Sequence, residues 1–576
     1  MLDVKKERLL NIGMHCLFVI IISWAALWGI ERNTTVTILT DEFAYWTPAA
    51  WLNGRDWSAV MHNYPYYGYG YGFLLAIIMK VFCDVRMMYQ IALFMNAVML
   101  ICSYYVAYKC WLALINHNKR QGMLGAFMAV IYSSNIFYAR MTLVEVFFGL
   151  LYWILIWLSI TMGHSRLKKM LFFLTLMLLL ASHNRALGII VAFVLSLLIC
   201  WHKEESKKEK LELFIFLLLT YFGVYIGKKY FQSVLYPNSS DNIMKITDTA
   251  GQVSKIKFLF SLNGLTSFFI SLFGKSYYVL ISSFLIVGCG FIYAVKKVIS
   301  SFRQRDWINL FPYFFAILSF LTVLCISAIY FAPSYLYRMD TLLYGRYHEC
   351  LIGPFILFGI AELIQQKNDV KEMIYIILTG ILLTIFTIQY IPRDQSITNF
   401  GINCVGVSDL FYKTFSITET IYTALLRGIA FIVVLFILKS RKKKWSKLFY
   451  CCFGLLAVCW IDIALFDAET RIYQWTEATV ASNSIMLEEV EKDNGKLEEL
   501  YFYQLDKENY NASFLQFIRP DAEIIYLENK EELGKLEVGT IVLTENESDI
   551  PEKKISDDQP YESIASNYYF TVWRKK

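Results

Sequence analysis

The sequence predicts a polytopic α-helical membrane protein that ends in a small α/β domain. Three observations predict this class: 57% of the residues are hydrophobic, 18% are charged, and the mean hydropathy is +0.45. Soluble domains carry about 25% charged residues, so most of this chain is expected to face lipid. Because the apolar runs are nearly contiguous up to residue 466, we expect a membrane domain over residues 1–466 and an appended domain over residues 467–576.

Charge and cysteine usage exclude two other classes of protein. The net charge is +6, but Lys and Arg lie in short clusters between apolar runs, which is typical of topology signals rather than of a nucleic-acid surface. The twelve cysteines fall mostly within apolar segments, and none follows Cys459, which argues against a disulfide framework. The first apolar run lacks a small-residue cleavage site, so we expect it to remain as a spanning helix.

Apolar runs of spanning length recur along the membrane domain, and about thirteen are expected to be transmembrane helices. The run Gly72–Cys83 is too short to span and suits a re-entrant or interfacial helix. The expected spans lie near residues 12–30, 89–113, 122–138, 143–161, 169–183, 186–202, 211–228, 276–295, 308–331, 350–366, 372–390, 421–438 and 447–466.

The positive clusters predict the orientation of the chain. With Gly72–Cys83 not spanning, five clusters lie on the same side as the N-terminus, and the positive-inside rule makes that side the cytoplasm. The first loop, residues 31–88, and the C-terminal domain are then extracytoplasmic. The five clusters are Lys119–Arg120, Arg166–Lys169, Lys207–Lys210, Lys296–Arg305 and Arg441–Lys444.

Two adjacent acids, Asp41 and Glu42, open the first external loop close to the predicted membrane surface. A carboxylate there can act as a general base toward an incoming hydroxyl, or can bind a divalent cation such as Mg²⁺ or Mn²⁺. A solvated acidic loop or a helix cap explains the same pair without chemistry. The pair alone does not decide between these interpretations.

A third acid, Glu145, is expected at the start of the helix that follows the next external turn. An acid beside lipid needs a partner, and a plain ion pair with Arg140 would supply one. We favour the alternative in which Glu145 faces the Asp41 loop and, with Asp41, is a candidate metal ligand.

Arginines recur at the same external level, at Arg185, Arg338 and Arg346. Guanidinium groups suit phosphate oxygens, although any one of these side chains would also suit lipid headgroups at a helix end. Carboxylates and arginines on one face describe a site for a phosphate-linked substrate that resides in the membrane.

This order of motifs resembles the GT-C superfamily of membrane glycosyltransferases, which use polyprenyl-phosphate-linked sugars. The resemblance rests on Asp41–Glu42 in the first external loop, the short helix after it, Glu145 after Tyr138–Arg140, Arg185, and Arg346–Tyr347. It implies sugar transfer with inversion to a hydroxyl of a glycan, lipid or protein acceptor, and it implies substrate-binding roles for Arg140 and Tyr347.

The chain departs from many members of the superfamily in the first loop. Where those members carry a basic residue before a Pro-Pro pair, this chain reads His62-Asn63-Tyr64-Pro65-Tyr66. We keep His62 as a candidate substrate-binding residue. The departure leaves the acceptor open among the components of a cell envelope.

The C-terminal domain is polar and acidic, with short apolar runs typical of strands at residues 499–503, 523–527, 540–543 and 568–573. Residues 511–518 are expected to form a helix between the first two strands. The domain shows no nucleophile motif, metal cluster or glycine-rich phosphate loop, so we expect an acceptor-binding or structural module.

The sequence therefore predicts a glycosyltransferase that acts at the outer face of the cytoplasmic membrane, and other classes of protein remain open. These are a polysaccharide flippase or transporter, an O-antigen ligase or polymerase, and a non-catalytic scaffold. A shared site requires the carboxyl groups of Asp41, Glu42 and Glu145 to converge at one cavity, with an arginine within about 10 Å. Tyrosines from residues 64–71 are expected in its walls.

Overall fold

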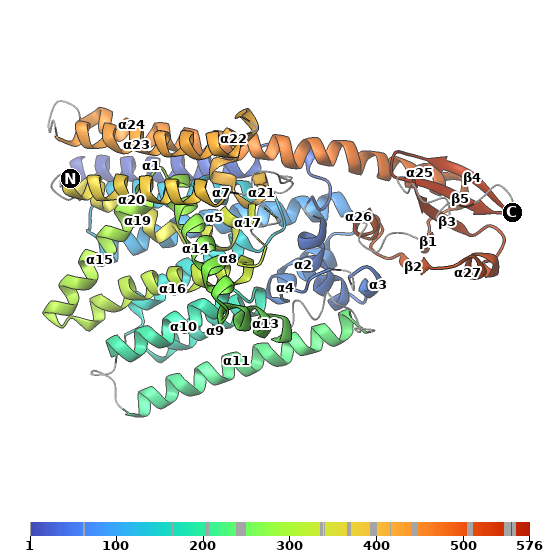
Figure 1. The fold of residues 1–576 in the computed structure, drawn as a ribbon, viewed down its shortest axis with the longest axis horizontal. Coiled ribbons are helices and arrows are strands. Elements are labelled where there is room, and N and C mark those ends of the chain that lie inside the picture. Colours follow the sequence, from blue (N-terminus) through green and yellow to red (C-terminus); the bar gives the residue numbers. More distant parts are fainter. Residues whose placement is uncertain are drawn as a thin grey trace.

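The structure is a computed structural model, elongated along one axis (Figure 1). A helical bundle with the N-terminus occupies one end, and a small sheet domain with the C-terminus occupies the other. The structure describes residues 2–37, 39–61, 64–163, 165–201, 207–237, 249–334, 338, 340–365, 370–391, 400–414, 416–440, 446–503, 511–546, 555 and 560–576.

Long apolar helices build the bundle, which confirms the predicted class of polytopic membrane protein. Within the described residues, 8 helices are long and apolar enough to cross a membrane, or up to 9 if a bent pair counts as one span. The bundle helices are α1 (Leu2–Leu27), α5 (Val85–Leu114), α6 (Lys119–Val130), α7 (Ser133–Tyr138), α8 (Glu145–Thr161), α9 (Arg166–Ser182), α10 (Ala186–Ser196), α11 (Lys207–Leu235), α14 (Leu262–Ser282), α15 (Ile286–Gln304), α16 (Trp307–Phe331), α19 (Gly353–Gln365), α20 (Val370–Gln389), α23 (Ile417–Ser440) and α24 (Ser446–Ala468).

Two predicted spans are each broken into two helices. The expected helix at residues 122–138 is α6, which ends at Val130, followed by α7, which begins at Ser133. The expected helix at residues 276–295 is two helices, α14 and α15, because the chain breaks between them, where Phe284 and Leu285 adopt φ of 53° and 67°. Non-glycine residues rarely adopt this left-handed conformation. Both residues are apolar and buried, so hydropathy gave no sign of the break.

Short helices from the first loop lie between the bundle and the sheet domain (Figure 1). The first loop forms α2 (Leu39–Leu52), α3 (Ser58–Met61) and α4 (Gly70–Val81), so the predicted short helix near Gly72–Cys83 is confirmed. Further along the chain lie α13 (Thr249–Leu259), α17 (Asp340–Leu343), α18 (Arg346–Glu349), α21 (Phe400–Asn403) and α22 (Val405–Thr414).

The first loop packs tightly against the junction of α9 and α10. The Tyr69 backbone N–H donates to the Ala181 carbonyl at 2.8 Å, and a Cβ placed on Gly68 would lie 2.2 Å from that same oxygen. Only glycine permits this approach. Gly68 thereby places the neighbouring Tyr67 beside the start of α10.

The C-terminal domain is a five-stranded mixed sheet of order β2-β1-β3-β5-β4. All four predicted strand regions and the predicted helix α26 (Asn511–Ile518) are present, and the added elements are β4, α25 (Ala481–Asn494) and α27 (Lys530–Lys535). Strand β1 is parallel to β2 and β3, and β5 is antiparallel to β3 and β4. The strands are β1 (Glu499–Tyr503), β2 (Glu523–Leu527), β3 (Ile541–Glu545), β4 (Tyr561–Ser566) and β5 (Phe570–Lys575).

Two connections join the sheet domain to the bundle. Helix α24 continues through π-helical turns at Glu469–Tyr473 and Thr476–Val480 into α25, so the proposed boundary at residue 466 lies within one helical rod. The second connection is aromatic: Phe517 of α26 packs edge-on against Trp46 of α2 at 5.4 Å between ring centroids. The sheet domain therefore rests on the helix that carries Asp41.

Candidate active site

Asp41 lies in the first turn of α2, where the helix dipole favours an acid. Its Oδ1 accepts a hydrogen bond from the Tyr67 hydroxyl at 2.6 Å, and its Oδ2 accepts one from Arg346 Nη1 at 2.5 Å. The side chain keeps 15% exposure. Asp41 is thus ordered by two partners and remains reachable.

Glu145 begins α8 and meets the same arginine. Its Oε1 accepts from Arg346 Nε at 3.0 Å and from Arg185 Nη1 at 3.3 Å. Arg346 therefore bridges Asp41 and Glu145, which places the two predicted acids at one site. We call the ladder of Asp41, Arg346, Glu145 and Arg185 the charge ladder.

Arg185 ends the charge ladder with unused donors. Its guanidinium lies over the ring of Phe148 at 4.5 Å and near that of Tyr347 at 5.5 Å. The Nε and Nη2 atoms are buried and have no hydrogen-bond acceptor within the described part of the chain. Because buried donors are nearly always paired in native proteins, these two point to an acceptor that the protein does not supply.

His183 shows that positive charge dominates around the ladder. Its ring stacks on Tyr67 at 5.6 Å between centroids, and its Nδ1 accepts from the Arg185 backbone N–H at 3.1 Å. Burial lowers the pKa of His183 well below its usual value, and the charges of Arg185, Arg346 and Lys228 lower it further. Burial and these three cations therefore favour the neutral form of His183.

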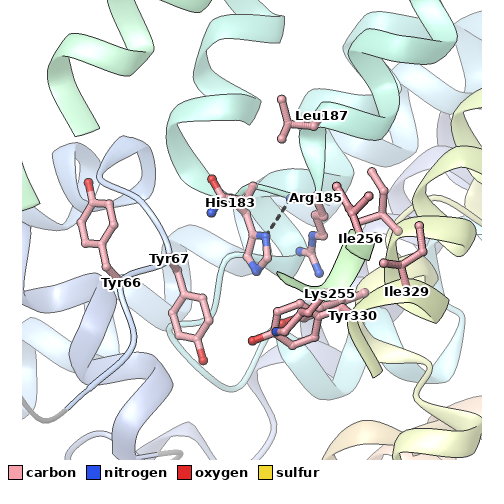
Figure 2. Close-up of a pocket in the computed structure, with 12 residues that line it drawn as sticks. Tyr66, Tyr67, His183, Arg185, Leu187, Lys255, Ile256, Ile329 and Tyr330 are labelled. Carbon is pink, nitrogen blue, oxygen red and sulfur yellow. Dashed lines mark hydrogen bonds between the residues drawn. The ribbon is translucent and has the colours of Figure 1, made fainter. Parts of the chain in front are cut away.

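A cavity of about 240 Å³ opens beside Arg185 (Figure 2). Its other cation is Lys255 of α13, whose Nζ lies 3.2 Å from the centroid of the Tyr330 ring. Burial lowers the pKa of Lys255 to about 8. The walls, largely apolar and aromatic, are formed by Tyr66, Tyr67, His183, Asn184, Arg185, Leu187, Lys255, Ile256, Ile326, Ile329, Tyr330 and Tyr347.

Comparison with solved structures gives the fold. The crystal structure of ArnT from Cupriavidus metallidurans bound to undecaprenyl phosphate matches with a TM-score of 0.54 and 11% identity, over 97% of this chain and 98% of that chain. The apo form of the same protein matches with the same score, over 97% of each chain. The chain has the same fold as ArnT.

The other comparisons add little to this result. The oligosaccharyltransferase of Archaeoglobus fulgidus matches with a TM-score of 0.42 and 10% identity, over 92% of this chain and 69% of that chain; this score is too low to carry an argument. No protein-family model matches the sequence. No curated protein matches it either. The comparisons therefore show a fold shared with ArnT, without a match in sequence to a family model or a curated protein.

Glu42 binds a different set of partners from the charge ladder. Its side chain is fully buried, and its oxygens accept from the Tyr89 hydroxyl at 2.6 Å and from the backbone and side chain of both Thr37 and Thr142 at 2.6–2.9 Å. This network ties α2 to α5 and to the turn before α8. We therefore reassign Glu42 from catalysis to holding α2 in place.

Arg140 also binds neighbouring helices and does not line the cavity. Its guanidinium is buried and donates to the carbonyls of Ile136, at 2.6 Å, and of Ala25, and to the Tyr473 hydroxyl at 3.3 Å. These contacts join α1, α7 and the π-helical turn Glu469–Tyr473 of the helical rod. The geometry does not support the predicted binding of substrate by Arg140, or its pairing with Glu145.

The remaining predicted residues fall in three places. Tyr347 lines the cavity. Arg338 pairs with Asp340 at 2.7 Å and keeps 46% side-chain exposure. His62 lies outside the described residues. Sequence reasoning missed His183 and Lys255, although a basic, partly apolar stretch in an external loop was a visible signal for Lys255.

The predicted metal ligands do not fit a divalent cation. Within the described residues, there is no group of three or more His, Cys, Asp or Glu side chains that could hold a metal ion. Asp41 and Glu145 share Arg346 instead. Because the two permanently charged guanidinium groups of Arg346 and Arg185 already balance the two carboxylates, a divalent cation would have to displace a guanidinium.

Proposed function

We propose that this chain is a GT-C glycosyltransferase that moves a sugar from a polyprenyl-phosphate carrier to an acceptor hydroxyl at the outer membrane face. The observation that carries the proposal is Arg185, which directs unpaired buried donors beside an apolar cavity. A phosphate oxygen is an acceptor that guanidinium groups bind well. Lys255 supplies a second positive charge at the same cavity.

The shape and chemistry of the cavity support a lipid carrier. Leu187, Ile256 and Ile329 form one part of its wall, and Tyr66 and Tyr67 lie on the opposite side (Figure 2). Apolar walls with a few directed polar groups suit a ligand with a hydrocarbon tail and a charged head. The ArnT structure of the same fold holds undecaprenyl phosphate, which is the carrier class that we propose here.

Asp41 is the proposed general base. It takes the proton of the acceptor hydroxyl while that oxygen attacks the anomeric carbon of the sugar. The bond from the anomeric carbon to the phosphate oxygen breaks, its electron pair leaves with the phosphate, and attack from the opposite face inverts the anomeric centre. Charge develops on the leaving phosphate, where the preorganised guanidinium of Arg185 contributes most.

Arg346 is the proposed resident cation of the site. It touches both Asp41 and Glu145, so it orients the base and neutralises the acid behind it without a metal. When a carrier phosphate competes for this guanidinium, Asp41 gains freedom to accept a proton. The reaction as proposed therefore needs no divalent cation.

The proposed orientation places the N-terminus in the cytoplasm and the sheet domain outside. The start of α11, the end of α15, the end of α23 and the start of α24 lie at the same end as the N-terminus (Figure 1). Basic clusters flank these helix ends in the sequence, and the positive-inside rule places such clusters in the cytoplasm. In a cysteine-free background, Asp56→Cys and Lys530→Cys should react with an impermeant thiol reagent in intact cells. Arg305→Cys should react only after lysis, and protection of the first two sites would overturn this orientation.

Binding and turnover test the proposed function. The purified chain should bind undecaprenyl phosphate, and Arg185→Ala should weaken binding by about tenfold to 100-fold, as expected for loss of a charged hydrogen bond. Arg427→Ala is the matched control, because Arg427 pairs with Asp409 away from the cavity. Equal effects of the two variants would sink the phosphate role of Arg185. Binding without release of the carrier from any sugar-linked donor would favour a transporter instead.

A further inference from the structure

A second buried acid, Glu349, lies at the other end of the one-turn helix that carries Arg346. Its carboxylate accepts hydrogen bonds from the hydroxyls of Tyr132 at 3.2 Å and Tyr138 at 3.3 Å, and from those of Ser134 and Tyr278. We call these four donors the hydroxyl cage. Glu349 is 2% exposed, and it touches neither the cavity nor any group proposed to react.

The hydroxyl cage is itself fixed to the surrounding helices. The Tyr138 hydroxyl also donates to the Ile402 carbonyl at 2.8 Å, and the Tyr278 hydroxyl accepts from the Gly406 backbone N–H at 2.9 Å. Three members come from α7 and the residue before it, and Tyr278 comes from α14. The cage is therefore a rigid socket built by distant parts of the chain.

Helix α18 is held by contacts along its whole length, among them the hydrogen bond from the Gly345 backbone N–H to the Asn403 carbonyl at 2.7 Å and the packing of Tyr347 against Phe331 and Tyr344, and Glu349 anchors its last residue. It spans only Arg346–Glu349, and the segment that contains it, Asp340–Glu349, is bent by 83° from Gly353–Gln365. A single helical turn is not stable alone, so side-chain anchors must hold it. Glu349 enters the hydroxyl cage while Arg346, one turn earlier, reaches Asp41 and Glu145.

We propose that Glu349 is a positioning residue, which seats α18 in the hydroxyl cage and so fixes the guanidinium of Arg346 between Asp41 and Glu145. A carboxylate suits this task because it has only acceptor sites and can take up all four hydroxyl donors. An apolar side chain would leave these buried hydroxyls unpaired, which is unfavourable. The geometric part of the proposal stands alone, whereas its effect on the carrier rests on the proposed function.

A double-mutant cycle tests whether Glu349 acts through Arg346. In the purified full-length chain, Glu349→Ala should weaken the binding of undecaprenyl phosphate by about tenfold, the scale of coupling between residues of one network. In an Arg346→Ala background, the same change should weaken binding by less than about twofold, because the residue to be positioned is absent. Equal losses in both backgrounds would overturn the proposal.

Matched variants separate positioning from general damage. Glu362→Ala removes another buried acid, which lies in α19 and pairs with Lys296. Its effect on binding should be the same in both backgrounds. Tyr138→Phe removes one cage hydroxyl at nearly constant volume and should reproduce a smaller form of the Glu349 coupling if Glu349→Ala fails to fold. Absence of coupling in Tyr138→Phe would then count against the role of Glu349.

A ligand-free measurement keeps this test distinct from the proposed function. If the wild-type chain does not bind undecaprenyl phosphate, the proposed function fails. The double-mutant cycle is then measured by thermal unfolding instead of by binding. The shifts in melting temperature for Tyr138→Phe and Arg346→Ala should then be non-additive. Additive shifts would overturn the positioning role whatever the ligand is.

Discussion

Two regions of the molecule hold buried acids in opposite ways. In the charge ladder, Asp41 and Glu145 share the guanidinium of Arg346. In the interior, Glu42 accepts from threonine and tyrosine hydroxyls and from backbone N–H groups, and Glu349 accepts from the hydroxyl cage. A guanidinium can exchange its carboxylate for a phosphate, whereas a set of hydroxyls built into several helices cannot leave.

The contrast shows that the partner of a buried acid, rather than the acid itself, distinguishes a reactive role from a structural role. An acid paired with an arginine responds to an incoming anion, because the two anions compete for one cation. An acid bound by hydroxyls contributes fixed hydrogen bonds and keeps its neighbours in register. The predictions below break or sharpen this distinction, beginning with the largest effect.

The largest effect is expected for Asp41→Asn. The change keeps the side-chain volume but removes the base, so turnover should fall by about 10² to 10⁴-fold, with little change in the melting temperature. Release of carrier phosphate from sugar-linked donors by the purified chain measures the effect. Asp56→Asn, in the same loop, is the control, and near-normal turnover in Asp41→Asn would remove Asp41 from catalysis.

Arg346→Ala should have the next largest effect, with a loss of about 10² to 10³-fold in turnover, typical of one preorganised charged donor. Arg346→Lys should restore only part of it, because an ammonium group cannot bridge two carboxylates as a guanidinium fork does. The same donor assay measures both variants. Full rescue by lysine would show that charge alone matters and that the bridge does not.

Glu42→Gln should act mainly on stability. Loss of carboxylate acceptors leaves buried donors unpaired, so the free energy of unfolding should fall by about 1–3 kcal/mol, while turnover should fall by less than the loss in Asp41→Asn. Thermal unfolding and the donor assay, run on the same preparation, compare the two quantities. A catalytic loss equal to that of Asp41→Asn, with unchanged stability, would return Glu42 to the active site.

A weaker effect is expected from pH at the cavity wall. Because the pKa of Lys255 is lowered to about 8, its ammonium is charged below that pH and loses its charge above it. Carrier-phosphate affinity should therefore fall as pH rises through about 8, by no more than about tenfold per pH unit for one proton. Titration of binding between neutral and alkaline pH checks this, and Lys255→Met should flatten the profile.

The smallest effect is expected from metal removal. Since Arg346 and Arg185 together already balance the charges of Asp41 and Glu145, the site needs no metal charge, and EDTA should change turnover by less than about twofold. Added Mg²⁺ or Mn²⁺ should not increase it. Loss of turnover in EDTA that Mn²⁺ restores would support the metal role originally expected for Asp41 and Glu145.

Sequence reasoning predicted the class of fold, the short helix within the first loop and the strands of the sheet domain, because these depend on local hydrophobic patterns. It also predicted that Asp41, Glu42 and Glu145 share a site with at least one of Arg185, Arg338 and Arg346, since their helices end on one side of the membrane. It could not separate Asp41 from Glu42. Adjacent residues of a helix point about 100° apart, and only the packing of α2 decides which one faces the arginine.

Other wrong predictions have the same cause, which is tertiary packing. Arg140 looked like a partner for substrate because it lies in a polar turn, yet it satisfies carbonyls of two helices. The break at Phe284 and Leu285 is hidden within a continuous apolar run. Each outcome depends on which helices become neighbours, and that information is spread over the whole chain.

The helical rod that joins bundle and sheet domain sets a distance. It runs 48 residues from Lys447 to Asn494, roughly 70 Å at about 1.5 Å per residue, of which about 30 Å suffices to cross the hydrocarbon core. The sheet domain is held at a second point where Phe517 meets Trp46, so it is fixed at two places rather than hinged. The rod and this aromatic contact therefore hold the sheet domain at one height above α2, the helix that carries Asp41.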